Sequence, residues 1–403
     1  DLARRMAEVQ SRSLGTWQRA KADADFSVFA PTLSEVIALT LEKADALVDA
    51  GIAENRYDAL LDAYEPGATE TQLAALLGDL RAELSPLVKA VADSGVTVDE
   101  SPARGVFPDA AQLSLGRAVA GAVGYDFDAG RIDESAHPFT SGFGSGDVRI
   151  TWRPEPDDFR PGLFGIMHEA GHAMYEQGLP SDLARTPLGS AVSLGIHESQ
   201  SRLWENQVGR SRPFWEWALP HFHEAFPESS AVTVDSLFPA LHTIRPSLVR
   251  VDADEGTYNL HIVARFEIER QLVAGTVGVD DLPELWSDTY DELLGVRPTS
   301  VADGVLQDIH WAMGAIGYFP TYTLGNLVAA QLFDAATAAI DDLPGRLATG
   351  DFEPLLAWLH ENVHQHGRRL SADELVARAT GAPLSSEPFL AYLRTTASEV
   401  YGI

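Results

Sequence analysis

The segment from His168 to His172, which reads His-Glu-Ala-Gly-His, constrains this chain more than any other. It lies in residues 164–177, a stretch with helical character, and residues four apart on a helix share a face. His168 and His172 can therefore direct two imidazoles at one metal ion, while Glu169 beside them can hold a water molecule. Two neutral nitrogens and a carboxylate base in this pattern are typical of a zinc peptidase.

A catalytic zinc usually has three protein ligands and one open position. A second helix-like stretch, residues 190–210, follows a proline-containing turn, which leaves room for it to pack on the first helix. Glu198 in this stretch is our first candidate for the third ligand. Glu205 is a rival, because seven residues further on it shares the same helical face. The structural alternative for Glu198 is a salt bridge to Arg202, four residues on.

A second match to the same motif, His360 to His364, lies near the end of the chain. The acids that follow it do not lie in a comparable pair of helices. The segment that contains His364, His366, Arg368 and Arg369 has the character of a solvated basic helix end. We therefore predict that the first match holds the metal and that the second does not.

Composition excludes several classes of protein. The chain has no cysteine, so a zinc site must be built from His and carboxylate, and disulfides are excluded. Its formal net charge of −30 repels phosphate, which argues against nucleic acid and anionic membranes as partners. No apolar run is long enough to span a bilayer, and the charged first residues do not resemble a signal peptide. We expect a cytoplasmic protein with an acidic surface.

Helical periodicity dominates, so we predict a mainly α fold that forms a single domain over residues 1–403. Expected helices cover residues 32–49, 69–92, 255–274, 280–294, 326–340 and 353–366. The exception is residues 137–152, where a glycine-rich turn is followed by alternation of Val148, Ile150 and Trp152 with polar residues. This predicts a small sheet before the metal helix. Its strand edge could align an extended peptide, or the sheet could be a plain structural hairpin.

Six segments in order resemble the motifs of the carboxypeptidase Taq family of thermostable zinc metallocarboxypeptidases. They are His137-Pro-Phe139, Asp147-Val-Arg-Ile-Thr151, His168-Glu-Ala-Gly-His172, His197-Glu-Ser-Gln200, Val249-Arg-Val-Asp-Ala-Asp254 and Gly304-Val-Leu-Gln-Asp-Ile-His-Trp311. The resemblance covers at least residues 137–330 and extends to segments near the N-terminus. Members usually carry a longer segment before the position of Asp1, which supplies helices near the mouth of a groove, and we expect these to be shortened or missing here.

The resemblance implies a large helical fold with a deep groove, like that of neurolysin and angiotensin-converting enzyme. It implies removal of single amino acids from the free C-termini of peptides, with broad specificity. One Zn²⁺ ion per chain is expected, and Co²⁺ often substitutes for it in this family. A homodimer is usual in the family and therefore possible here.

Residue roles follow from the matched motifs. The resemblance implies that His168, His172 and Glu198 are the metal ligands and favours Glu198 over Glu205. Glu169 is expected to be the general base that moves a proton from water to the leaving amine. His197 adjoins a ligand, so it is expected to contact substrate or to orient the site, although a buried structural role is the alternative.

A carboxypeptidase must also bind a free carboxylate and stabilise an oxyanion. Arg250 is the first candidate for the carboxylate, because a guanidinium binds it through two parallel hydrogen bonds; Arg149 and Arg245 are the runners-up. Asp254 is a candidate for holding a metal-bound histidine in one tautomer, or else for a structural ion pair.

His310, Tyr318 and Tyr322 are candidate donors to the oxyanion, by analogy with related helical zinc peptidases. Core packing is the alternative for the tyrosines.

Two other functions remain open from the sequence. One is an oligopeptidase or endopeptidase on the same scaffold. The other is a non-catalytic peptide-binding or metal-binding protein. The presence of Glu169 and of all three candidate ligands argues against the second, and Arg250 argues against the first.

Overall fold

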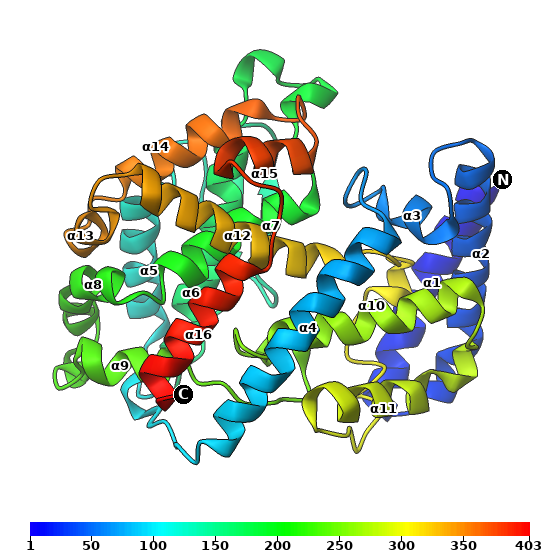
Figure 1. The fold of residues 1–403 in the computed structure, drawn as a ribbon, viewed down its shortest axis with the longest axis horizontal. Coiled ribbons are helices and arrows are strands. Elements are labelled where there is room, and N and C mark those ends of the chain that lie inside the picture. Colours follow the sequence, from blue (N-terminus) through cyan, green and yellow to red (C-terminus); the bar gives the residue numbers. More distant parts are fainter. The chain divides into compact units, whose positions relative to one another are not determined.

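The computed structural model describes residues 1–403 and divides into two compact units, each built from two stretches of chain. The first unit contains residues 1–93 and 244–323, and the second contains residues 94–243 and 324–403. The predicted fold class is confirmed: both units are built mainly from helices (Figure 1), and the small sheet lies in the second.

The first unit is entirely helical (Figure 1). Its α-helices are α1 (Leu2–Asp23), α2 (Ala30–Asp49), the short α3 (Arg56–Leu61), α4 (Glu70–Asp93), α10 (Tyr258–Ala274) and α11 (Leu282–Leu294). The short 3-10 turn η7 (Arg250–Asp252) contains Arg250 of the predicted site, and His310 directly precedes a second such turn, η9 (Trp311–Met313). Most of α10 is buried around its whole circumference, so it is the central helix of this unit.

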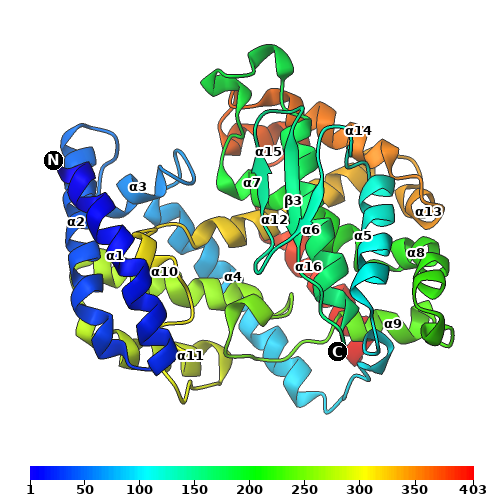
Figure 2. The same cartoon turned by 180° about the vertical axis from the view of Figure 1, so that it is seen from behind.

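The second unit surrounds α6 (Phe159–Gln177). Its other α-helices are α5 (Asp109–Val123), α7 (Leu194–Arg202), α8 (Arg212–Ala225), α9 (Val234–Leu241), α12 (Pro320–Ala339), α13 (Leu343–Ala348), α14 (Glu353–Asn362), α15 (Ala372–Thr380) and α16 (Glu387–Tyr401). The part of α12 before Leu324 belongs to the first unit. Figure 2 shows the sheet running along α6.

The sheet has three strands in the order β1-β3-β2, which makes β3 (Val148–Trp152) the central strand. β1 (Ile132–Glu134) pairs parallel to it, and β2 (Thr140–Gly142) pairs antiparallel to it. Val148, Ile150 and Trp152 are buried and Arg149 is exposed, as the alternation in the sequence predicts, but Thr151 is buried as well. One face of β3 therefore covers the metal helix.

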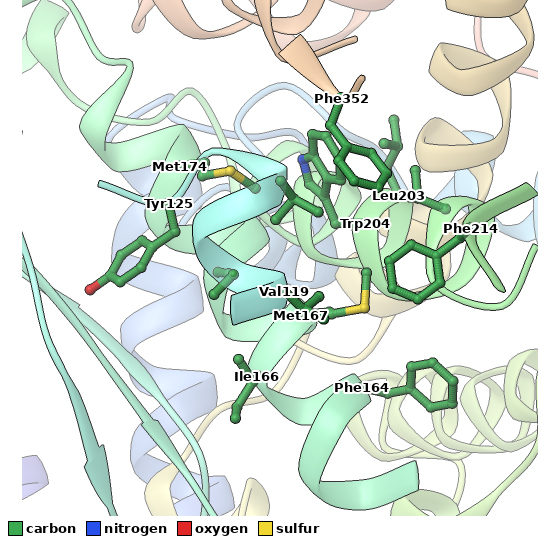
Figure 3. Close-up of a cluster of buried hydrophobic side chains, with 14 of the residues drawn as sticks. Val119, Tyr125, Phe164, Ile166, Met167, Met174, Leu203, Trp204, Phe214 and Phe352 are labelled. Atoms are coloured by element: carbon green, nitrogen blue, oxygen red, sulfur yellow. The ribbon is translucent and has the colours of Figure 1, made fainter. Parts of the chain in front are cut away.

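α6 is apolar on nearly every side because it passes through the core of its unit. It begins at Asp158, whose side chain accepts a hydrogen bond from the backbone N–H of Arg160, and it ends before Gly178. Figure 3 shows this core, in which side chains of α6 and of its neighbours meet: Phe164, Ile166, Met167, Met174, Val119, Leu203, Trp204, Phe214 and Phe352. Such packing holds α6 in one orientation, which fixes the direction of its two histidines.

Several predicted helices differ from the structure at their ends; for example, α12 begins six residues before the predicted start at residue 326. The stretch predicted from residue 190 begins at Leu194, because Ser193 caps it by accepting a bond from Ile196 N–H. Beyond Arg202 it becomes a π-helix, η5 (Leu203–Val208). The helix predicted over residues 353–366 ends at Asn362. His360 and His364 therefore do not share a helical face.

A buried carboxylate, Glu269 on α10, joins three parts of the first unit. It accepts hydrogen bonds from Tyr57 Oη at 3.2 Å, Trp311 Nε1 at 2.9 Å and the backbone N of Gly317 at 3.0 Å. Burial raises the pKa of Glu269 to about 7, although these donors and Arg265 act in the opposite direction. Its proton is therefore held more tightly in the folded chain than in the unfolded one.

This shift makes stability depend on pH. Because the folded pKa lies above the ordinary value of 4.5, the contribution of Glu269 falls as pH rises from about 4.5 to about 7. The full effect is on the order of 3 kcal/mol at most. We expect the melting temperature of the unmodified protein to fall between pH 5 and pH 8.5, and that of Glu269→Gln to fall less. The difference between the two falls should be several degrees in scanning fluorimetry. Equal falls would contradict the assignment.

Candidate metal centre

The two histidines of α6 meet a carboxylate of α7 because the two helices cross closely. A Cβ added at Gly171, between the histidines, would lie only 2.5 Å from the backbone O of Gln200. The same construction at Gly325 of α12 would place a Cβ 2.4 Å from Cγ of Glu198. Glycine at these two positions thus leaves the space that the Glu198 side chain and its helix occupy.

His168, His172 and Glu198 form a group whose potential ligand atoms all lie within 4.8 Å of one another. Nε2 of His172 is 3.4 Å from Oε2 of Glu198, and Nε2 of His168 is 3.8 Å from it. The other carboxylate oxygen, Oε1, accepts from Nε of Arg202 at 2.8 Å. Glu198 therefore makes the salt bridge considered from the sequence and still presents one oxygen to both histidines.

Neighbouring positive groups keep Glu198 ionised although it is buried. Burial alone would raise its pKa, but Arg202 and the two histidines lower the pKa well below its ordinary range. The carboxylate is therefore ionised at neutral pH. Two imidazole nitrogens and an anionic oxygen that converge in this way are suitable ligands for a divalent metal ion.

Glu205, the rival ligand, contacts the opposite nitrogen of His168. Its Oε2 lies 2.8 Å from Nδ1 of His168 and 3.1 Å from Nη1 of Arg202. Burial would raise the pKa of Glu205, but Arg202 and His168 lower it to about 2. An ionised carboxylate at Nδ1 keeps the proton on that nitrogen, so Nε2, on the side of Glu198, is the nitrogen that can bind a metal ion. Glu205 reaches this position from the π-helix η5.

His172 has a comparable support, which involves His197. Nδ1 of His172 lies 3.0 Å from the backbone O of His197 and 2.6 Å from its Nδ1. Nε2 of His197 is 2.9 Å from Oε1 of Glu176. When His197 donates this Nε2–H to Glu176, its Nδ1 is an acceptor for His172. Glu176 was missed in the sequence, although its spacing of four residues from His172 places it on the same helical face.

Glu169 lies beside the group and is buried. The hydroxyl of Thr140 on β2 lies 2.6 Å from Oε2 of Glu169 and 3.1 Å from its backbone O. Thr140 was also missed. It directly follows Phe139, the last residue of a recognised motif, but nothing in a single sequence shows which element its side chain will face.

A second group of predicted residues lies in the first unit. Nε and Nη2 of Arg250 donate to Oδ1 of Asp308 at 3.1 and 2.9 Å, and Nη1 donates to Tyr258 Oη at 3.0 Å. Arg265, which is fully buried, donates to Oδ2 of Asp308 at 2.7 and 2.5 Å. Burial would raise the pKa of Asp308, but the two guanidiniums lower it well below its usual range.

The cluster of Arg250, Arg265 and Asp308 therefore carries one positive charge in excess. The three hydrogen bonds of the Arg250 side chain use three of the five N–H hydrogens that a guanidinium offers. One N–H hydrogen on Nη1 and one on Nη2 remain. A guanidinium can bind both oxygens of a carboxylate through one N–H of each of these two nitrogens.

His310, Tyr318 and Tyr322 come together in the same unit. Nε2 of His310 is 3.1 Å from Oη of Tyr322, and the rings of His310 and Tyr318 have centroids 5.1 Å apart. Burial, together with Arg250 and Arg265 and against the opposite effect of Asp308, lowers the pKa of His310 to about 4. His310 is therefore neutral at pH 7, and its buried Nδ1 has no hydrogen-bond partner.

The remaining candidates have local partners. Asp254 accepts from the backbone N–H groups of Arg245 and Thr257, both at 2.9 Å, and so holds the turn that precedes α10. Burial raises the pKa of Asp254 to about 6. Arg149 is half exposed and forms two 2.8 Å hydrogen bonds to Asp147 on the outer surface of the sheet.

In the second His-Glu-x-x-His segment, His364 packs inside the protein. The prediction that the end of this segment is exposed to solvent is therefore wrong for His364. That side chain is buried against Gly178, and its Nε2 lies 2.9 Å from Oε1 of Gln200. Burial lowers the pKa of His364 to about 3. The sequence could not reveal this, because the chain packs the end of α14 against α6 and α7 over a long separation.

A helical fold with a His-Glu-x-x-His helix, a glutamate from the next helix and a buried carboxylate beside them defines a metallopeptidase. The sequence profile of the family described as Carboxypeptidase Taq (M32) metallopeptidase matches residues 1–397. The chain belongs to this family, and it is a metallocarboxypeptidase. The resemblance inferred from the six motifs is thereby confirmed.

Curated relatives agree with this assignment. A thermostable carboxypeptidase 1 from Thermus thermophilus is 46% identical over all of this chain and 80% of its own length. Carboxypeptidase 1 from Bacillus subtilis is 41% identical over 97% of this chain and 78% of its own.

Solved structures show the same fold. An M32 carboxypeptidase from Deinococcus radiodurans has a TM-score of 0.96 and 41% identity, covering all of this chain and 80% of its own. A Pyrococcus furiosus carboxypeptidase has a TM-score of 0.94 and 39% identity, covering 98% of this chain and 79% of its own. In the present chain, no helix combines the length and the apolar character that a membrane span requires.

The close packing at Glu198 generates a direct test. Gly325→Ala would force a methyl group against Cβ and Cγ of Glu198. We expect the substitution to cost about 1–3 kcal/mol and to reduce the metal content of the purified protein, measured by elemental analysis alongside the melting temperature. Gly78→Ala, where an added Cβ meets nothing within 4 Å, is the matched control. Unchanged metal content and stability in Gly325→Ala would show that the contact does not position Glu198.

Proposed function

We propose that the protein is a zinc-dependent carboxypeptidase that removes single amino acids from peptide C-termini with broad specificity. The observation that carries the proposal is the convergence of Nε2 of His168, Nε2 of His172 and Oε2 of Glu198. Cytoplasmic location and a homodimer stay predictions from the sequence and from the family resemblance.

The donor set fits zinc. In a tetrahedral site with ligand distances of about 2 Å, two ligand atoms lie roughly 3.3 Å apart. The distances of 3.4 and 3.8 Å from Glu198 Oε2 to the two imidazoles are close to this value. Held by these ligands, Zn²⁺ would supply a Lewis acid that polarises the scissile carbonyl and would lower the pKa of a water molecule enough for its deprotonation at neutral pH. Co²⁺ suits the same ligands.

Glu169 is the general base in this proposal. The hydroxyl of Thr140 donates to its Oε2, which leaves Oε1 to take the proton of the attacking water. The same oxygen then delivers that proton to the amine of the departing amino acid. Thr140 holds the carboxylate in the orientation that both transfers require, and burial of Glu169 limits competing contact with bulk water.

The residues of the first unit are proposed to recognise the substrate. Arg250 binds the terminal carboxylate through its two remaining N–H groups, and Asp308 and Arg265 fix its guanidinium. The positive charge in excess favours an anion there. His310, Tyr318 and Tyr322 are proposed as donors to the oxyanion. The neutral state of His310 and the absence of a partner for its Nδ1 support a donor role.

No observation favours the alternatives. An endopeptidase would not need an arginine cluster with an unbalanced positive charge, and a binding protein would not need a buried carboxylate beside the metal ligands. The family assignment likewise favours a carboxypeptidase over both.

Replacing Glu169 with Gln tests the base. We expect Glu169→Gln to lower kcat by about a thousandfold or more, because the amide cannot accept the proton, while the zinc content stays at one ion per chain. The measurement is mass spectrometry of a peptide digested with the zinc-loaded protein. The unmodified protein should produce a ladder that loses one C-terminal residue at a time. A variant of similar activity, or internal cuts by the unmodified protein, would contradict the proposal.

Replacing Arg250 with Lys tests recognition of the carboxylate. Lys keeps the charge but not the paired hydrogen bonds, so kcat/KM should fall about tenfold to a hundredfold. Arg297→Lys, an exposed arginine of the same unit, is the matched control. The unmodified protein should also discriminate strongly against a C-terminally amidated peptide, and Arg250→Lys should discriminate less. Equal discrimination by both proteins would remove Arg250 from this role.

A further inference from the structure

The segment that joins His310 to Tyr318 has little regular structure of its own. Its only helical part is the short turn η9, and Gly317 near its end has a left-handed backbone with a φ angle of 86°. Backbone hydrogen bonds connect residues 310–315 to one another. The backbone N–H of Gly317 donates instead to a side chain, that of Glu269. The position of Tyr318 relative to His310 therefore depends on a group outside the segment.

Glu269 on α10 binds both ends of this segment, and each end has its own carboxylate oxygen. Oε1 accepts from Nε1 of Trp311, which directly follows His310. Oε2 accepts from the backbone N–H of Gly317, which directly precedes Tyr318. Glu269 is fully buried, so these bonds do not compete with bulk water. One carboxylate thus fixes the immediate neighbours of two side chains that are proposed to stabilise the oxyanion.

The helix α3 is joined to the same point. Tyr57 Oη of α3 also donates to Oε2 of Glu269, and a Cβ added at Gly317 would lie only 3.2 Å from the backbone of α3. Tyr64, three residues after the end of this helix, packs edge to face on Tyr318, with ring centroids 5.1 Å apart. The contacts of Glu269 therefore also fix the helix from which a neighbour of Tyr318 extends.

The same helix α10 carries Arg265, four residues before Glu269 and on the same face. Arg265 donates to Oδ2 of Asp308 and to Oε1 of Gln307. Through Asp308 it supports Arg250, the proposed site for the terminal carboxylate of the substrate. The two buried side chains of α10 thus support different parts of the site. Arg265 supports the group for carboxylate binding, and Glu269 supports the group for the oxyanion.

We propose that Glu269 is a positioning residue for the reaction, which holds His310 and Tyr318 in the relation in which both donate to the oxyanion. The inference rests on the proposed function. Without the carboxylate, Gly317 loses its acceptor and Tyr318 can shift away from His310, while Arg250 keeps its own partners. The loss then falls on the transition state and not on substrate binding, so kcat decreases and KM does not change.

The first test replaces the carboxylate with an amide. Glu269→Gln keeps one acceptor oxygen, but its NH₂ group must face one of the donors, Trp311 or Gly317. We expect kcat per zinc-loaded chain to fall about tenfold to a hundredfold and KM to stay within about twofold. Discrimination against a C-terminally amidated peptide should be unchanged. Leu84→Ala, a buried residue of α4, is the control and should lower the melting temperature without changing kcat.

The second test uses a milder change and an inhibitor. Trp311→Phe removes one donor and keeps an aromatic ring, so it tests the same contact even if Glu269→Gln does not fold. We expect kcat to fall about tenfold with KM unchanged. A phosphinic peptide, in which a tetrahedral phosphinate replaces the scissile amide, imitates the tetrahedral intermediate. Its inhibition constant should rise by about the factor by which kcat falls in each folded variant.

The proposal is overturned if either folded variant keeps the kcat of the unmodified protein. It is also overturned if the loss lies in KM alone, or if the inhibition constant of the phosphinic peptide does not rise. An unmodified protein that does not shorten a peptide with a free C-terminus would instead contradict the proposed carboxypeptidase function.

Discussion

The close crossing of α6 and α7 is the constraint on which the rest of the metal centre depends. Two histidines on one helix cannot complete a three-ligand site, and the carboxylate must come from a second helix at short range. Gly171 permits the approach of the two backbones, and Gly325 of α12 leaves room for the Glu198 side chain on the other side. The apolar surroundings of α6 then keep this geometry rigid.

The ligands are supported by charged groups that lie behind them. Glu205 faces Nδ1 of His168, and the backbone of His197 faces Nδ1 of His172, so both rings are directed through Nε2. Arg202 bridges the two glutamates and, together with Arg210 beside Glu205, offsets their charge. Leaving any of these buried ions without its partner would carry a large desolvation cost. The charges therefore act as one interdependent unit, and removing one member disturbs the others.

The sequence was informative where chemistry is encoded by spacing within one element. The separation of His168 and His172 defined the metal-binding face, and the alternation at Val148, Ile150 and Trp152 defined β3. Contacts between distant elements were not predictable in this way. Thr140, Glu176 and the buried His364 act across separations that no local pattern records. Glu205 was noticed, but only the packing of the π-helix decides which nitrogen of His168 it contacts.

The most direct test of the central claim is anomalous X-ray diffraction at the zinc edge from crystals of the zinc-loaded protein. The account predicts one peak per chain, about 2 Å from Nε2 of His168, Nε2 of His172 and Oε2 of Glu198, with Glu205 at Nδ1 of His168 and not at the metal. A peak coordinated by Glu205 in place of Glu198, or a peak at the His360 to His364 segment, would contradict it.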